Sequence, residues 1–326
     1  MFLKRSVFAL ILSVAAACVF LFGGALKTDR ERDEKRYKGI VTLWHIDTFE
    51  GGTGSRKRFL SDVAIKYEKK RDGTLIMVIG YTIGGAEEEM KNGNYPDMIS
   101  FGNGLKLDAF TSLDLKNDYP EGTFSGKTAA AVWAKGEYAL FTKDGITGKE
   151  IEELTVSQSD YNLPLVAFAL SGYSADKITV KPPADAYSDF VNGATDCLLG
   201  TQRDVIRLIN RGYNATVTPL TAFSDLNQFI AITGDNPQKN ACAREFIDLL
   251  LSDMVQSDLI KIGLFSVYGN TVYEDGNLLT LSGIKNRGIS AFYGREKIEE
   301  IRAISYSASA GDKNALEKLN NVAFLP

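Results

Sequence analysis

Short apolar runs of strand length alternate with amphipathic segments over residues 40–101. The run 40–44 (IVTLW) predicts a buried strand, and Phe59, Val63 and Tyr67 then recur at the four-residue spacing of an amphipathic helix. The pattern continues with a strand at 75–79, a short helix at 86–92 and a strand at 97–101. Strands that alternate with helices form a largely parallel sheet, and ligands bind at the carboxyl ends of its strands. The sequence therefore predicts an α/β fold with functional loops after residues 44 and 101.

The rest of the chain mixes strand and helix patterns. Strands are expected at 138–142, 163–169, 178–180, 197–199 and 227–233. Helices are expected at 185–192, 236–251, 253–263, 294–305 and 312–321. Asn236 and Pro237 form a typical helix start, because asparagine caps the first turn and proline is accepted within it.

The length and charge of the chain narrow the class of protein. The 326 residues suit two lobes of ordinary size, and 44% apolar with 24% charged residues is typical of a folded globular protein. The formal net charge is −4, whereas nucleic-acid-binding proteins normally carry an excess of basic residues. We therefore expect no nucleic-acid partner.

The segment 1–26 predicts an export signal or a membrane anchor. Its uncharged run of 21 residues is long enough to cross a bilayer as a helix, and Lys4 and Arg5 place the start of the run in the cytoplasm. Three outcomes stay open: cleavage at a lipobox with a lipid on Cys18, signal-peptidase cleavage near 23–25, or an uncut anchor. Each outcome delivers the rest of the chain to the outer face of a bacterial cell membrane, or secretes it.

The segment 27–38 (KTDRERDEKRYK) alternates in charge sign and lacks the apolar side chains that would pack in a core. Such a segment stays solvated. We therefore expect a charged tether between the membrane and the folded body.

Cysteine and histidine are scarce. Outside the leader only Cys197 and Cys242 remain, and in an exported protein they either form a disulfide or serve as two small buried residues. The chain has one histidine and no CxxC motif, so a zinc site of the usual kind is not predicted, and we expect no cofactor.

Four stretches occur in a fixed order along the chain. They are LWH…GGTGSRKRFL, NGNYPDMISFG, DFVNG…LLGTQRDV and QFIAITGDNPQKNACAREFIDLLLSD. In this order the chain resembles the extracellular solute-binding proteins of bacterial ABC importers, the broad class that includes maltose-binding protein. The resemblance covers most of residues 39–265, and it depends on the joint order more than on any single motif.

The resemblance implies a type II periplasmic-binding-protein-like α/β fold, with mixed sheets flanked by helices in two lobes and a hinge between them. Lobe 1 would comprise 37–137 and 224–264, and lobe 2 would comprise 138–223 and 265–326. The second lobe would be reduced, because the sequence shows little between residues 143 and 162, where the class has several helices. The two cysteines would then lie in different lobes, which favours free thiols because a disulfide would lock the hinge.

The resemblance also implies ligand contacts in the loops 44–56, 101–103 and 201–204, and at aromatic residues beside the first crossover between lobes. The candidate residues are Trp44, His45, Asp47, Gly52, Ser55, Arg56, Phe101, Asn103, Trp133, Tyr138, Gln202 and Arg203. Aromatic rings stack on the faces of sugar rings, but each of these aromatic residues fits core packing as well.

The turn from Gly51 to Arg56 is suited to an anion. Its glycines let backbone N–H groups approach a ligand, a helix N-terminus follows, and Arg56 adds a planar guanidinium. A flexible turn before a helix capped by Ser55 explains the same residues. Arg203, if it faced Arg56 across a cleft, would favour an acidic sugar.

These observations predict a solute-binding protein rather than an enzyme. It would capture a sugar, an oligosaccharide or a sugar acid by closing its lobes, and deliver it to ABC permease subunits in the membrane. A membrane-tethered ligand sensor is one alternative. A carbohydrate hydrolase is another, and it would need paired carboxylates such as Asp47 and Asp225 in the cleft. No set of residues matches a catalytic triad.

Overall fold

The structure is a computed structural model, and it describes residues 37–48, 52–107, 110–113, 120–145, 148–268 and 272–323. The chain separates into two compact units, of which Ile40–Pro326 contains the sheets described below. The predicted leader, its Cys18 and most of the charged tether lie outside the described residues. Within the described ranges no helix is long and apolar enough to cross a bilayer.

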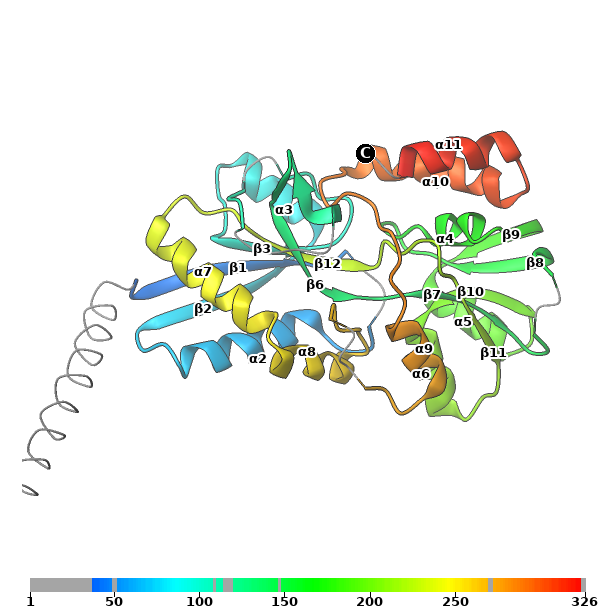
Figure 1. Cartoon of the computed structure of the whole chain (residues 1–326), viewed down its shortest axis with the longest axis horizontal. Helices are drawn as coiled ribbons and strands as arrows, with labels where there is room; N and C mark the ends of the chain where they lie inside the picture. Colours follow the sequence, from blue (N-terminus) through cyan, green and yellow to red (C-terminus); the bar gives the residue numbers. More distant parts are fainter. Residues whose placement is uncertain are drawn as a thin grey trace, which may run out of the picture. The chain divides into compact units, whose positions relative to one another are not determined.

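The first five-stranded sheet has the strand order β2-β1-β3-β12-β6 (Figure 1). Its strands are β1 (Gly39–Ile46), β2 (Thr74–Tyr81), β3 (Met98–Phe101), β6 (Ala130–Lys135) and β12 (Asn227–Ile232). Strands β1 and β3 are parallel, with Trp44 opposite Ile99, whereas β12 runs antiparallel to both of its neighbours. The sheet is therefore mixed, and it combines strands that lie far apart in the sequence.

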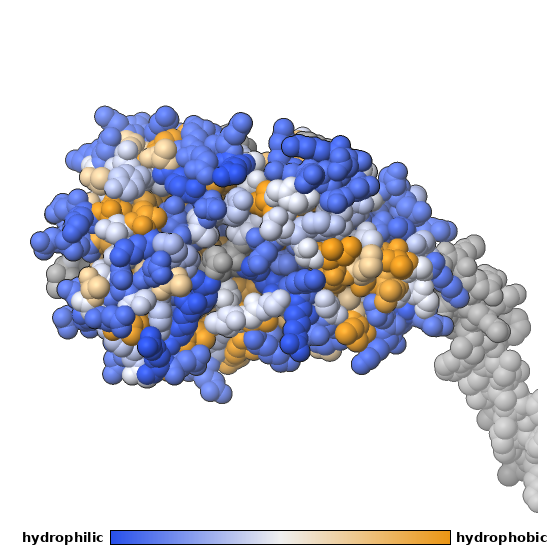
Figure 2. Space-filling view, turned by 180° about the vertical axis from the view of Figure 1, so that it is seen from behind, coloured by the Kyte–Doolittle hydropathy of each residue, from blue (hydrophilic) through white to orange (hydrophobic). Residues whose placement is uncertain are grey.

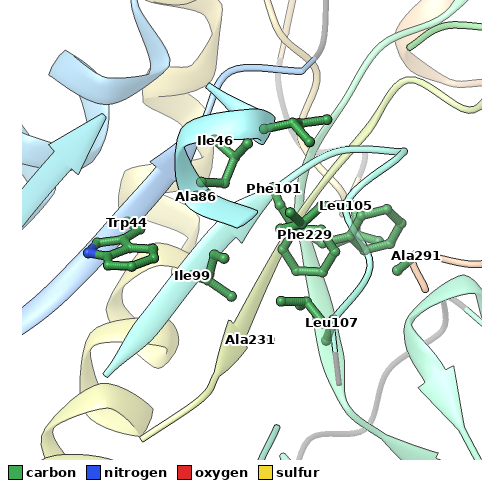
Figure 3. Packing of buried hydrophobic residues seen from close by; sticks show 13 residues of the cluster. Trp44, Ile46, Ala86, Ile99, Phe101, Leu105, Leu107, Phe229, Ala231 and Ala291 are labelled. Carbon is green, nitrogen blue, oxygen red and sulfur yellow. The ribbon is translucent and has the colours of Figure 1, made fainter. Parts of the chain in front are cut away.

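Helices cover both faces of the first sheet. Helix α3 (Ile83–Lys91) lies over a core cluster that includes Trp44, Phe101 and Phe229 (Figure 3). Val132 of β6 belongs to the same cluster, so the next residue, Trp133, points to the opposite face. There its ring stacks on Phe59 of α2 (Arg56–Glu68), and α7 (Pro237–Leu250) packs beside α2.

The second five-stranded sheet has the order β11-β7-β10-β8-β9. Its strands are β7 (Tyr138–Thr142), β8 (Glu150–Ser157), β9 (Ser174–Lys181), β10 (Cys197–Thr201) and β11 (Thr216–Pro219). Strands β10, β8 and β9 are parallel, and β7 is antiparallel to β10 and β11. The helices that lie around the second sheet in Figure 1 are α4 (Pro164–Leu170), α5 (Pro183–Val191), α6 (Gln202–Arg211), α9 (Gly276–Ser282), α10 (Arg295–Ser309) and α11 (Lys313–Ala323).

Short segments carry the chain from one sheet to the other. Two residues join β6 to β7, and the segment 220–226 joins β11 to β12. A later segment returns to the first sheet, because Ala291 belongs to the same core cluster as Phe229.

The strand predicted at 163–169 is wrong, because these residues form α4. Pro164 occupies the first turn of the helix, and every residue from Pro164 to Ala169 is buried. A short run that is apolar on all sides has no periodicity by which a strand can be told from a buried helix. Several elements were not predicted, among them β6, β8, β11, α6 and α9.

Candidate functional site

The loop after β1 forms an ion pair rather than an open arginine site. Arg56 pairs with Asp47, and the side chain of Arg56 is 11% exposed against 70% for Asp47. Ser55 is the N-cap of α2 as predicted, and its side chain accepts a hydrogen bond from the Arg58 N–H at 3.2 Å. The guanidinium of Arg56 thus faces a carboxylate of its own loop.

The glycine turn packs against the end of the 3₁₀ helix Asp258–Ile262 (η2). The N–H groups of Thr53 and Gly54 donate to the carbonyl of Ile262 at 2.9 and 3.4 Å. A Cβ on Gly52 would lie 2.5 Å from the same carbonyl oxygen. The glycines do allow a close approach, but the group that approaches is the chain's own backbone.

His45 belongs to a buried polar cluster on the first sheet. Its Nδ1 lies 3.3 Å from the Ser100 hydroxyl, which also accepts hydrogen bonds from Trp133 Nε1 at 3.1 Å and Gln228 Nε2 at 3.4 Å. Trp133 Nε1 can only donate, so the Ser100 hydroxyl oxygen accepts from it, whereas the donor and acceptor roles between Ser100 and His45 depend on the imidazole tautomer. Burial, and then the charge of Arg56, lower the pKa of His45 to about 4, so the ring is neutral at pH 7.

The aromatic residues predicted as sugar contacts pack against other rings. Trp44 lies 4.6 Å from Tyr81 between ring centroids, and Phe101 lies 5.7 Å from Phe229. Phe101 and Trp133 are fully buried, and Trp44 is 5% exposed. These rings are core residues, and the structure leaves Phe101 and Trp133 no exposed face on which a sugar could stack.

Tyr138 and Asn103 meet at a buried carboxylate between the sheets. The Tyr138 hydroxyl donates to Asp225 Oδ1 at 2.7 Å, and Asn103 Nδ2 donates to Asp225 Oδ2 at 2.9 Å. The Leu163 N–H donates in turn to the Tyr138 hydroxyl at 3.2 Å. Burial raises the pKa of Asp225 to about 7, while the Tyr138 hydrogen bond lowers it. Because both oxygens of Asp225 accept buried hydrogen bonds, the geometry does not favour the hydrolase alternative.

Gln202 also connects the two sheets. It is fully buried at the start of α6, where its Oε1 accepts a hydrogen bond from the Glu137 N–H at 3.0 Å and its Nε2 donates to the Gly263 carbonyl at 3.3 Å. Thr201 and Asp204 form a capping box around the same turn, which holds the half-buried Arg203 at a fixed position on the helix.

Gly263 is the point at which the predicted loops come together. A Cβ at this residue would lie 2.8 Å from Ile206 of α6 and 2.9 Å from the hydroxyl of Thr53 in the glycine turn. The residue also has a φ of +67°, a conformation that glycine adopts without strain. The structure therefore brings the loop after β1 and the first turns of α6 to one place.

Sequence reasoning missed a pocket of about 250 Å³ at the crossing segments, which charged and polar residues help to line. The carboxyl group of Glu137 accepts a hydrogen bond from Asn286 Nδ2 at 2.6 Å and lies 3.7 Å from Lys135 Nζ. Ser224 and Glu121 also line the pocket. The sequence does contain a pattern that could have indicated this pocket. Lys135 and Glu137 are charged residues between the buried apolar runs of β6 and β7.

The described residues contain no group of three or more His, Cys, Asp or Glu that could hold a metal ion. Cys197 and Cys242 are free and buried, which confirms the preference for thiols over a disulfide. Burial raises the pKa of the Cys197 thiol to about 12, so this cysteine is unreactive in the folded protein.

Comparisons with known proteins identify the fold. No protein-family model matches the sequence, and no curated protein matches it. Among solved structures, the chain is similar to the GacH receptor of Streptomyces glaucescens, studied unliganded and with acarbose, at a TM-score of 0.57 and 15% identity over 88% of this chain and 97% of that one.

Two further structures give a similar match. The ABC substrate-binding protein Lmo0181 of Listeria monocytogenes, in complex with cycloalternan, matches at a TM-score of 0.55 and 11% identity, covering 88% of this chain and 98% of that one. The galacto-N-biose-/lacto-N-biose I-binding protein of Bifidobacterium longum, in complex with lacto-N-biose, matches at 0.55 and 12%, covering 88% and 95%. The chain therefore has the type II periplasmic-binding fold that the sequence predicted.

Proposed function

We propose that the chain is the extracytoplasmic solute-binding component of an ABC importer, and that its solute is a carbohydrate. The observation that carries the proposal is the meeting at Gly263 of loops from both sheets, the glycine turn and the start of α6. Ligands of α/β proteins bind at such strand-end loops. The names of the similar structures support a carbohydrate, because those proteins were solved with acarbose, cycloalternan and lacto-N-biose.

We place the ligand contacts on side chains that keep exposed surface in these loops. Asp47 and Arg203 would bind hydroxyl or acid groups of the sugar, with Arg56 fixed behind Asp47 by their ion pair. The partly buried Tyr161 would supply the aromatic surface, because its ring packs beside Gly104 in the loop after β3, at the margin of the core cluster, and keeps some exposed area. The buried residues His45, Asn103, Trp133, Tyr138 and Gln202 would position these loops.

We further propose that an N-terminal anchor or lipid holds the protein at the outer face of the membrane, where it delivers its solute to permease subunits. The charge pattern of residues 1–38 supports this location. No catalytic step is part of the proposal.

Thermal shift and calorimetry on residues 37–326 test the function. The panel would contain neutral oligosaccharides, sugar acids and sugar phosphates. A ligand at a hundred times its dissociation constant stabilises the fold by about 2.7 kcal/mol. We expect the protein to bind one carbohydrate class. Tyr161→Ala and Arg203→Ala should weaken this binding, whereas Arg211→Ala, at the far end of α6, should not. A folded sample that binds no member of the panel would contradict the proposal.

A further inference from the structure

Part of the first sheet presents exposed apolar side chains. Ile40 of β1 is 46% exposed, and Leu75 and Met77 of β2 are 47% and 40% exposed. We call these three residues the open face. Figure 2 shows apolar side chains on both halves of the molecule, including the half that contains the first sheet.

Strand geometry puts the three residues on one face of the sheet. The Asp47 N–H donates to the Tyr81 carbonyl at 3.2 Å, so β1 and β2, which are neighbours in the sheet, end together and also begin together. Trp44 of β1 and Ile79 and Tyr81 of β2 lie in or against the core under α3. Because side chains alternate between faces, the open face continues that core beyond the cover of α3, at the start of the two strands.

The surroundings of the open face have the residue types of a membrane interface. Lys69 and Lys70 are exposed in the turn just before β2, and Tyr95 is 48% exposed just before β3. Lysine and tyrosine beside aliphatic side chains are typical of surfaces that lie at the lipid headgroup level. Asp72 and Glu88 are exposed nearby, so the apolar residues rather than net charge would supply the attraction.

The position of the open face in the chain limits its distance from the uncharged N-terminal run. The uncharged run 6–26 is followed by only 13 residues, 27–39, before Ile40. Even fully extended, these residues span at most about 47 Å, at about 3.6 Å per residue. If the run is held in the bilayer, the first residue of the open face cannot lie farther than this from the membrane.

We propose that the open face rests on the lipid headgroups of the membrane that anchors the protein. This inference depends on the anchoring proposed above. With this contact, the same face of the first sheet would always point toward the membrane, and the second sheet would not touch lipid.

Photo-crosslinking of the full chain in phosphatidylcholine vesicles tests the inference. A photoreactive benzoylphenylalanine replaces Leu75 or Met77, and the matched control replaces Val180, which is 43% exposed on β9, the edge strand of the second sheet. We expect several-fold more lipid labelling from residues 75 and 77 than from residue 180. High salt should leave this ratio unchanged.

The results of this experiment distinguish the lipid contact from the proposed anchoring and from the proposed function. Equal labelling at all positions, or crosslinks from residues 75 and 77 to a second copy or another protein instead of lipid, would overturn it. A chain that does not float with the vesicles would overturn the anchoring and the lipid contact together. Carbohydrate binding by the same vesicles is measured separately, and its absence would count against the proposed function alone.

Discussion

Replacing Glu137 with glutamine should remove a specific pH dependence of stability. Burial raises the pKa of this carboxyl from 4.5 to about 8, against the opposing effect of Lys135. In the unfolded chain a glutamate releases its proton near pH 4.3. Between pH 5 and pH 7 the folded protein therefore holds about one proton more than the unfolded chain at this site, and this excess falls to about half a proton at pH 8.

The extra proton that Glu137 holds in the folded state sets the sign and the size of the pH dependence of stability. A group whose pKa is raised by folding stabilises the folded state at low pH and loses that contribution as the pH rises toward the folded pKa. One proton corresponds to a fall of about 1.4 kcal/mol per pH unit in the free energy of unfolding, or about 4 kcal/mol between pH 5 and pH 8. Glu137→Gln keeps an acceptor for Asn286 but cannot titrate.

Urea denaturation of residues 37–326 at several pH values from 5 to 8 measures the effect. The free energy of unfolding of Glu137→Gln, minus that of the unchanged protein, should rise by about 4 kcal/mol over this range. The control is Glu153→Gln, because it removes the same charge from a side chain that is 61% exposed and lies outside the buried pair. A constant difference for Glu137→Gln over this pH range would refute the reasoning from burial.

Three further predictions concern single residues of the site. Gly263→Ala should destabilise the fold by about 1–3 kcal/mol more than Gly212→Ala, because both residues have positive φ but only at Gly263 does a Cβ meet other atoms; equal losses in urea denaturation would contradict this. Tyr138→Phe should cost about 1–3 kcal/mol by leaving an Asp225 oxygen without its donor, and a smaller loss would count against that hydrogen bond. The His45 ring should not titrate between pH 5 and 8 in NMR spectra, given its pKa of about 4, and a midpoint near 6.5 would show that it is not buried.

Much of the fold could be predicted from the sequence because the first sheet follows simple periodicity. Strand β1, helix α2 and strand β2 have clear apolar patterns, and the structure places them within a few residues of the predicted bounds. Helix α4 could not be predicted, because a fully buried helix has no polar side to reveal its period. Strand β8 was missed for the opposite reason, since Glu150, Glu152 and Glu153 give its first half a strongly charged character.

The candidate site was harder to predict because residue type does not reveal burial. Glycine in the turn before α2 was expected to admit a ligand, and the structure uses it to admit the Ile262 carbonyl. Phe101 and Trp133 were expected near a sugar, yet both are fully buried. An aromatic residue on a central strand contributes the same apolar area to either role, and only the arrangement of the neighbouring helices decides between them.

The polar residues buried between the sheets suggest why the site is built as it is. Asp225 accepts hydrogen bonds from Asn103 after β3 and Tyr138 of β7, and Gln202 bridges Glu137 and Gly263. Buried hydrogen bonds are directional and costly to leave unmade, whereas apolar contacts tolerate sliding. Connections of this kind would favour a small number of defined arrangements of the two sheets. In the proposed function, the loops of both sheets that bind the solute would then be positioned by residues that do not touch the solute. Changes at Asp225 or Gln202 should therefore alter the affinity for the solute without removing a ligand contact.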